Sequence, residues 1–150
     1  MRIAISADQI KGCGLYLADE LRKRGHEVLP FGAFDPAHKP EFADDWAPVS
    51  AAAAREVAAG RADQAIVCCW TGTGASIAAN KVDGIRAALC SDAETAAGAR
   101  RWNHANVLAL SMRLTSGPVL MEILDAWFAT APSRDVADVL NVEHVAEIRR

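Results

Sequence analysis

The sequence predicts an α/β protein with one doubly wound (Rossmann-like) domain, a five-stranded parallel sheet with helices on both faces. Three observations support this. Short apolar runs alternate with segments of helical periodicity, about every 20 to 25 residues. One run, Gln64–Cys69 (QAIVCC), is almost wholly apolar, as expected for a parallel strand buried on both faces. The 150 residues suit one core, so we assign residues 1–150 to one domain.

The first 45 residues read as strand, helix, strand and loop. Arg2–Ser6 (RIAIS) is the first predicted strand, and Leu15–Arg24 is a helix that a glycine ends. His26–Phe31 (HEVLPF) is the second strand, and we expect Pro30 at its end because proline cannot donate a ladder hydrogen bond. Gly32–Asp45 lacks periodicity and is predicted to be a loop.

The middle of the chain repeats the alternation. Trp46–Ala59 is rich in alanine with helical spacing, and a glycine again follows it. The buried strand Gln64–Cys69 comes next, and Ala75–Lys81 is predicted as the helix after it. Gly84–Cys90 (GIRAALC) is the fourth predicted strand, because its apolar residues form a short run bounded by turn signals.

The last third contains one strand and three helices. Ser91 and Glu94 predict a capping box for a helix that runs to about Arg101. Asn106–Leu110 (NVLAL) is the fifth strand. Two further helices are predicted, an amphipathic one with a proline tolerated in its first turn and a terminal one: Ser116–Ala129 and Val142–Arg149.

Composition and cysteine spacing exclude several classes of protein. The net charge of −3 and the absence of a basic cluster argue against a nucleic-acid partner. No apolar stretch approaches the roughly 18 residues of a membrane span, and Asp8 interrupts the first apolar run before it reaches signal-peptide length. The four cysteines, Cys13, Cys68, Cys69 and Cys90, match no metal spacing, so we expect free thiols in a reducing, cytoplasmic compartment.

Ligands of a doubly wound sheet bind beyond the carboxyl ends of its strands. We expect three segments with polar or reactive side chains at that edge. Asp8 and Gln9 follow the first strand, Cys69–Ser76 follows the third, and Trp102–Asn106 closes the helix after the fourth.

The most specific segment is Cys69–Lys81, with the sequence CWTGTGASIAANK. Gly72 and Gly74 let the backbone approach a ligand, and the N–H groups that open the next helix suit a phosphate or an oxyanion. The alternative is a tight strand–helix turn that needs glycine without any ligand. Cys69 is the candidate general base or nucleophile, because cysteines at helix N-termini are often activated. Its alternative is a buried structural cysteine, a description that fits Cys68 better.

These residues resemble the ribose-5-phosphate isomerase B and galactose-6-phosphate isomerase family. CWTGTGASIAANK is similar to the family's Cys-Gly-Thr-Gly-x-Gly-x-Ser-Ile-Ala-Ala-Asn-Lys. The other matching positions are Asp8, Gly84-Ile85-Arg86-Ala87, Asn103-x-x-Asn106-Val107-Leu108-Ala109, Arg113 and Asp125-Ala126-Trp127.

The resemblance implies a homodimer whose active sites lie between subunits, and it leaves open whether dimers pair into tetramers. It also implies aldose–ketose isomerisation of a sugar or sugar phosphate without a metal or cofactor. Cys69 would move a proton between carbons 2 and 1 through a cis-enediolate, and Thr71 would help to move the hydroxyl proton. Main-chain N–H groups of Gly72–Gly74 would stabilise the enediolate oxygen. The predicted substrate-binding residues are Asp8, Gln9, Gly72, Thr73, Gly74, Ser76, Trp102, Asn103, His104, Arg113 and Arg134.

Several positions depart from the family pattern. Trp102 stands where the family has a ring-opening histidine, and an indole cannot act as an acid or base. Gln9 replaces a second histidine and Trp46 replaces a tyrosine. Of the family's C-terminal pair of phosphate-binding arginines, Arg134 is the one candidate.

Three hypotheses follow from these departures. The chain is a sugar-phosphate isomerase in which His104 opens the ring, or an isomerase whose substrate needs no ring opening, or a relative that binds a ligand or partner without catalysis. A tetrose 4-phosphate, whose oxygen 4 is blocked, would fit the second hypothesis, as would an unphosphorylated or acyclic sugar. Trp102 and Trp46 would either stack on a ligand or pack in a dimer interface.

Overall fold

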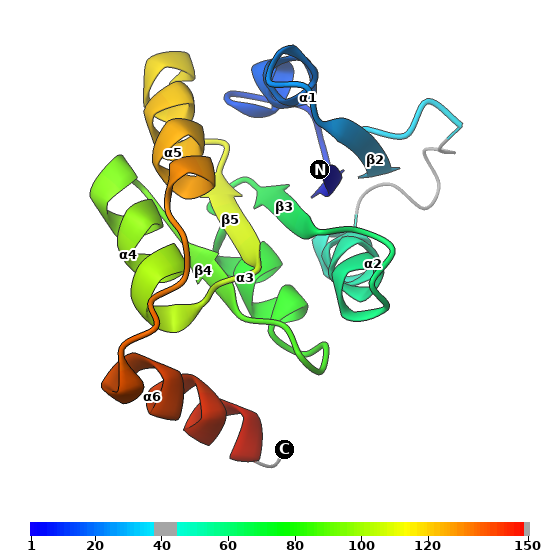
Figure 1. Cartoon of the computed structure of the whole chain (residues 1–150). Coiled ribbons are helices and arrows are strands. Elements are labelled where there is room, and N and C mark those ends of the chain that lie inside the picture. The colour runs from blue at the N-terminus through cyan, green and yellow to red at the C-terminus, as the bar shows by residue number, and fades with distance from the viewer. Residues whose placement is uncertain (38–44, 149–150) are drawn as a thin grey trace.

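The computed structural model describes residues 1–37 and 45–148. It confirms the predicted fold class: five parallel strands form one sheet in the order β2-β1-β3-β5-β4 (Figure 1). The strands are β1 (Arg2–Ala7), β2 (Glu27–Gly32), β3 (Gln64–Cys69), β4 (Ala87–Leu89) and β5 (Val107–Ser111). The helices are α1 (Gly14–Lys23), α2 (Trp46–Ala58), α3 (Thr73–Ala79), α4 (Ala93–Asn103), α5 (Gly117–Ala129) and α6 (Val136–Glu147).

The two faces of the sheet bury different kinds of side chain. Successive residues of a strand point to opposite faces, so each central strand serves both. Helices α1, α4 and α5 cover one face, where large residues such as Ile3, Ile66 and Leu108 lie. Helices α2 and α3 cover the other face, which is lined mainly by alanines such as Ala4 and Ala65. Small side chains on that face let α2 and α3 pack closely on the strands that carry the candidate site.

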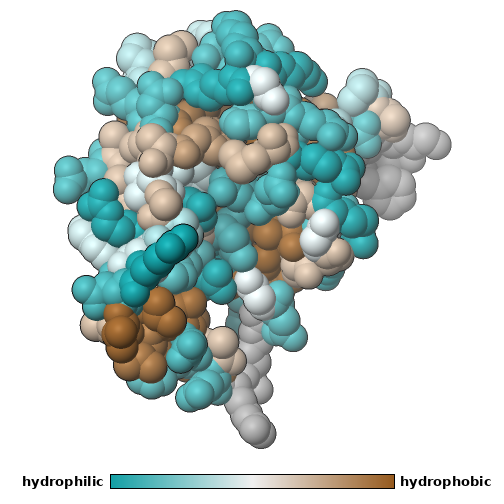
Figure 2. Space-filling view, in the orientation of Figure 1, coloured by the Kyte–Doolittle hydropathy of each residue, from teal (hydrophilic) through white to brown (hydrophobic). Residues whose placement is uncertain are grey.

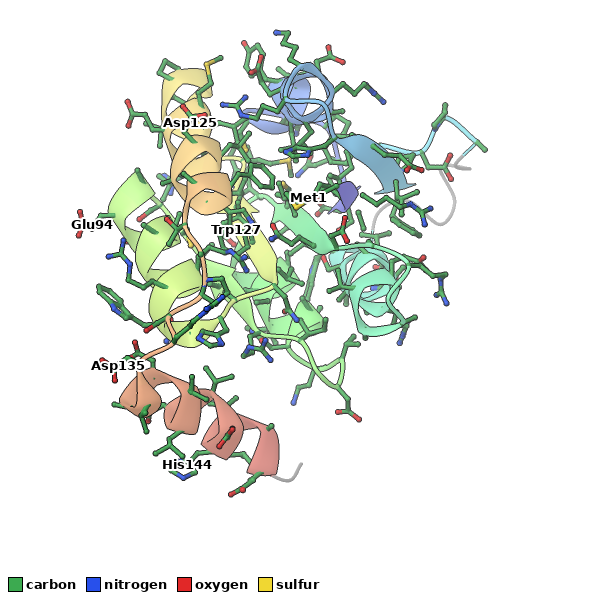
Figure 3. All side chains as sticks on the ribbon, in the orientation of Figure 1. Met1, Glu94, Asp125, Trp127, Asp135 and His144 are labelled. Carbon is green, nitrogen blue, oxygen red and sulfur yellow. The ribbon has the colours of Figure 1, made fainter. Side chains whose placement is uncertain are left out.

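A polar contact joins α5 to β3 on the face of the sheet that carries the large side chains. Trp127 is fully buried, and its indole Nε1 donates to Oε1 of Gln64 at 2.7 Å. Figure 3 shows Trp127 on α5, directed towards the sheet. The Arg100 guanidinium lies over the same ring, 5.3 Å from its centroid, and burial lowers the pKa of Arg100. Gln64 and Trp127 therefore satisfy each other in a place that water does not reach.

Two local predictions, on Pro30 and on the cap of α4, need correction. Pro30 lies inside β2, opposite Ile5 of β1, because β2 is an edge strand and proline there loses no ladder hydrogen bond. The cap of α4 is Asp92, whose Oδ1 accepts from the N–H of Thr95 at 2.7 Å, and these hydrogen bonds lower the pKa of Asp92. The predicted capping box of Ser91 and Glu94 was therefore one residue out of place.

The fourth strand and the last helix also differ from the prediction. β4 has three residues rather than the predicted seven, Gly84–Cys90. At its start, the N–H groups of Arg86 and Ala87 donate to the side chains of Asn106 and Asn80 instead of to a neighbouring strand. The last helix begins at Val136 instead of Val142, since Asp135 caps it through the N–H of Ala137.

Helix α6 carries apolar side chains that the chain itself leaves uncovered. Val136, Leu140 and Val145 are between 45% and 70% exposed, and Ile148, directly after the helix, is 72% exposed. Figure 2 shows an apolar patch over this helix at the lower left of the molecule, and in Figure 3 His144 lies on the same helix at the lower edge. α6 packs mainly on α4, so this helix is the least embedded of the six helices described.

We predict that Gln64→Leu lowers the free energy of unfolding by about 1–3 kcal/mol, because it leaves the buried indole N–H of Trp127 without an acceptor. Urea denaturation measures the change. Adding Trp127→Phe should cost less than the sum of the two single changes, because both partners of the hydrogen bond are then absent. Strictly additive costs would show that the hydrogen bond does not couple the two residues.

Candidate active site

Cys69 is the last residue of β3, at the carboxyl edge of the sheet. It pairs with Ser111 of β5, and the pairing continues beyond both strands. The N–H of Met112 donates to the Cys69 carbonyl at 3.1 Å, and the N–H of Arg113 donates to the Trp70 carbonyl at 3.0 Å. Backbone hydrogen bonds therefore fix the chain on both sides of the point where β3 ends.

The turn after Cys69 depends on Gly72. Its φ of +76° is left-handed, and a Cβ there would lie 2.8 Å from the carbonyl carbon of Leu110. This close approach directs the N–H of Gly72 to Sγ of Cys69 at 3.2 Å. Cys69 is only 4% exposed and belongs to the alanine-lined core on the α2 and α3 face of the sheet. The sulfur and this N–H are thus hydrogen-bonded to each other within one small turn.

The next residues of the turn present hydroxyl groups. Thr71 and Thr73 are exposed, and their Oγ1 atoms are 2.8 Å apart. Ser76 is half-buried in the second turn of α3. A Cβ on Gly74 would lie 2.9 Å from the ring of Trp46, so the first residue of α2 packs directly on this turn.

Asp8, Gln9 and Arg113 lie at the same edge. Asp8 and Gln9 follow β1, the strand beside β3, and both are half-buried. Arg113 follows β5 on the other side and is exposed. Two of the three segments predicted for this edge, Asp8-Gln9 and Cys69–Ser76, therefore lie there, together with Arg113.

The remaining cysteines are buried outside the glycine turn, and a hydrogen bond with Cys68 lowers the pKa of Cys13. Cys68 points to the opposite face from Cys69, as the sequence predicts, and is fully buried. A hydrogen bond with Cys13 and burial raise the pKa of Cys68 well above its usual range. Burial and the charge of Asp92 raise the pKa of Cys90 to about 12. Of the four cysteines, Cys69 alone lies in the glycine turn.

The expectation that Trp102–Asn106 lies at this edge is wrong for a single chain. These residues precede β5, and the Asn106 carbonyl accepts from the N–H of Ala65, at the start of β3. From Ala65 to Cys69, β3 spans about 13 Å at about 3.3 Å per residue. Trp102, Asn103 and His104 therefore lie at the amino edge, across the sheet from the thiol. The polar residues of the segment suggest a ligand site, but the direction in which α4 returns puts them at the opposite edge.

Arg134 is also at the amino edge. The preceding residue, Ser133, donates its N–H to the Arg101 carbonyl, and its own carbonyl lies 3.0 Å from Nε2 of His104. His104 thus holds the segment before α6 in place. Trp102 is 50% exposed, and Asn103 and Arg134 are exposed as well.

Hydrogen bonds from side-chain amide and guanidinium groups to the backbone stabilise the amino edge of the sheet. Asn80 bonds both the N–H and the carbonyl of Ala87, and Asn106 bonds the N–H of Arg86 and the carbonyl of Gly84. Nε of Arg86 donates to the carbonyls of Asn103 and His104 at 3.2 and 3.0 Å. Burial lowers the pKa of Arg86. These contacts fix the end of α4 and hence the backbone that carries Asn103.

Two neighbouring cavities in the described part of the chain lie on the amino side, away from Cys69. One has a volume of about 320 Å³, and its lining includes Arg86, Trp102, Asn103 and Val145. A neighbouring one is lined by residues of the same loop and of α6. Within residues 1–37 and 45–148, no group of three or more His, Cys, Asp or Glu side chains could hold a metal ion. No helix in these ranges could cross a membrane.

Sequence reasoning did not single out Lys11 or Trp70. The Lys11 Nζ lies over the Trp70 ring, 5.8 Å from its centroid, and Trp70 is 46% exposed. Trp70 occupies a position where the family pattern quoted above has glycine, and this difference is the signal that could have identified it.

Residues 3–143 match the family described as Ribose/Galactose Isomerase. The chain belongs to this family. It is 38% identical over 130 residues to a galactose-6-phosphate isomerase subunit from Clostridium acetobutylicum, covering 85% of this chain and 71% of that protein. It is 37% identical over 111 residues to the D-erythrulose-4-phosphate isomerase of Pectobacterium atrosepticum, covering 74% and 70%.

The fold agrees with the same assignment. Ribose-5-phosphate isomerase B from Clostridium thermocellum superposes with a TM-score of 0.86 at 37% identity, covering 98% of this chain and 96% of that one. The protein is thus an aldose–ketose isomerase of the ribose/galactose isomerase family, and its relatives act on different sugar phosphates.

We predict that Gly72→Ala destabilises the isomerase by about 1–3 kcal/mol more than Gly84→Ala, because only Gly72 has neighbours where a Cβ would lie. Gly84 is a matched control, since its φ of +78° is nearly the same and nothing lies within 4 Å of its Cβ position. Its replacement should cost about 1–2 kcal/mol, for the left-handed backbone alone. Equal shifts in denaturation midpoint would refute the close packing of the turn.

Proposed function

We propose that this isomerase acts through a cis-enediolate, with Cys69 as the general base. The observation that carries the proposal is the Gly72 turn, where the N–H of Gly72 donates to the Cys69 sulfur at 3.2 Å. The N–H groups that open α3 and the exposed threonine hydroxyls follow directly. A carbon acid needs a base and a stabilised oxyanion at the same moment, and this turn offers both.

The proposed steps conserve all atoms. The Cys69 thiolate removes the proton from carbon 2 of the aldose, and the electron pair moves to the carbonyl oxygen to give the enediolate. The N–H of Gly72 holds the Cys69 sulfur, and the N–H groups of Thr73 and Gly74 stabilise the negative oxygen. Thr71 helps to move the hydroxyl proton from oxygen 2 to oxygen 1. The Cys69 thiol then returns its proton to carbon 1, which yields the ketose.

We further propose that two copies of the chain build each site. Asn103 and Arg134 lie at the amino edge, whereas Cys69 lies at the carboxyl edge. One chain therefore cannot bring them to the same substrate, but a homodimer can if the amino edge of one subunit faces the carboxyl edge of the other. Asn103 lines the same cavity as Val145 of α6, so the exposed apolar residues of α6 add uncovered surface beside it.

The substrate that we favour is a short sugar phosphate that stays open-chain. Trp102 cannot supply the acid–base group that ring opening requires. His104 is committed to the Ser133 carbonyl, which weakens the hypothesis that it opens a ring. A relative that acts on a four-carbon sugar phosphate, D-erythrulose 4-phosphate, supports this choice. The alternative is a family member that binds a sugar-like ligand or a protein partner without catalysis.

We expect Cys69→Ala to keep the fold and to reduce isomerisation by about 10³-fold, because an acid–base group contributes about 10²–10⁴-fold. The assay incubates aldoses and ketoses of four to six carbons, phosphorylated and unphosphorylated, in heavy water and measures deuterium at carbons 1 and 2. Cys90→Ala is the control, since Cys90 is buried near the carboxyl edge but outside the turn. Full exchange by Cys69→Ala would exclude Cys69 as the base, and no exchange by the native protein would favour the binding role.

Shared sites predict complementation between inactive variants. Cys69→Ala and Asn103→Ala should each be nearly inactive, and an equal mixture that has exchanged subunits should regain about a quarter of native activity. Half of the dimers in such a mixture are mixed, and each of these has one intact site. A mixture that exchanges subunits, as mass spectrometry would show, and stays inactive would contradict the shared site.

A further inference from the structure

Two indole rings flank the turn that carries Cys69, and the first of them belongs to Trp46. Trp46 opens α2, which covers the alanine-lined face of the sheet. A Cβ on Gly74 would lie 2.9 Å from its ring, so the ring is in direct contact with the backbone of the turn. This is the stretch of backbone whose N–H groups open α3. The turn therefore has an aromatic wall on its α2 side.

The second ring, that of Trp70, lies on the other side of the same turn. The pairing of β3 with β5 continues past Cys69, so the alternation of strand side chains continues with it and directs Trp70 to the opposite face from Cys69. The contact of the ring with Lys11 agrees with this direction, because Lys11 lies in the loop that leads from β1 into α1. Helix α1 covers the face opposite to α2.

Backbone hydrogen bonds and one cation–π contact hold Trp70 in place, although it is 46% exposed. Its carbonyl accepts from the N–H of Arg113 at 3.0 Å and from Oγ of Ser111 at 3.1 Å. The Lys11 Nζ stands 5.8 Å from the centroid of the ring. An indole turns about only two side-chain torsions, so a ring on a fixed backbone with a cation over one face has little freedom to swing aside.

Both rings are larger than the side chains that the family pattern has at these positions. Trp70 stands in place of a glycine, and Trp46 in place of a tyrosine. Trp46 is 41% exposed, so each indole keeps an open surface at the carboxyl edge. The two departures add aromatic bulk on opposite sides of one turn, and they therefore narrow the same space from two directions.

We propose that Trp70, together with Trp46, sets the length of the sugar phosphate that the turn accepts. The inference rests on the proposed function, which places carbons 1 and 2 of the substrate at Cys69, and it names the residues that select the substrate. The rest of the substrate leaves the turn between the two rings. A four-carbon chain fits this space, whereas a longer chain must displace a ring whose backbone is fixed. One carbon more or less in an apolar site changes kcat/KM by about 10- to 200-fold.

The test compares two ketose phosphates that differ by one carbon, D-erythrulose 4-phosphate and D-ribulose 5-phosphate. Neither closes a five-membered ring, because erythrulose has too few carbons and the phosphate blocks oxygen 5 of ribulose, so ring opening does not enter the comparison. The native protein should have the higher kcat/KM on the four-carbon ketose. Trp70→Gly should raise the ratio of five-carbon to four-carbon kcat/KM by about 10- to 100-fold. Trp70→Phe, which keeps an aromatic ring, should retain most of the native preference.

Three further variants control for other effects. Trp70→Ala removes the ring without the backbone freedom of glycine and should match Trp70→Gly. Trp46→Tyr should raise the ratio by a smaller factor, because tyrosine keeps a ring, and an unchanged ratio would remove Trp46 from the proposal. Met121→Ala shortens a side chain on α5 that is 40% exposed, and it should keep the native ratio. The proposal is overturned if Trp70→Gly keeps the native ratio, including the case in which only its oligomeric mass changes and the ring belongs to an interface between copies.

A binding measurement separates this inference from the proposed function. The probes are 4-phospho-D-erythronate and 5-phospho-D-ribonate, which are not isomerised because a carboxylate takes the place of the reacting carbonyl. Calorimetric titration of the native protein should show tighter binding of the shorter probe, and Trp70→Gly should remove this preference. If Cys69→Ala exchanges deuterium like the native protein while the preference still depends on Trp70, the base assignment fails and the length selection stands. If Cys69→Ala loses exchange but Trp70→Gly binds both probes as the native protein does, the length selection is refuted and the base assignment stands.

Discussion

The continuation of β3–β5 pairing past the ends of both strands is the constraint on which the carboxyl edge depends. The carbonyls of Cys69 and Trp70 accept from the backbone of Met112 and Arg113, and Oγ of Ser111 also donates to the Trp70 carbonyl at 3.1 Å. The turn at Gly72 starts from this fixed ladder. The positions of the residues around Cys69 are therefore set by main-chain hydrogen bonds, which are less sensitive to substitution than side-chain packing. This explains how exposed residues can still have a defined geometry.

Much of the sequence shared with the isomerase family has a structural role. The side-chain amides of Asn80 and Asn106 replace ladder hydrogen bonds at the start of β4. Arg86 caps the carbonyl end of α4 and so holds the backbone of Asn103. A motif can thus match a family for two reasons at once, and only the geometry separates the residues that support the site from those that face a substrate.

The sequence predicted the sheet and the turn well, because both depend on local patterns. An apolar run sets β3, strand alternation separates Cys68 from Cys69, and paired glycines mark the turn. It failed for Trp102–Asn106, because placing a segment at one edge requires the direction of the returning helix as well as its residues. It also missed Lys11, since the contact with Trp70 joins residues far apart in the chain that no spacing rule connects.

The position of Pro30 has a consequence for how copies of this chain can associate. β2 forms one border of the sheet and contains a residue with no N–H, while β4 forms the other border with only three residues. Neither border offers a long row of unpaired donors and acceptors to an incoming strand. Continuous intermolecular sheets, including fibrillar ones, are thereby disfavoured in the native state. Assembly must instead use helices and loops, the parts of the molecule that carry Asn103, Arg134 and the uncovered side chains of α6.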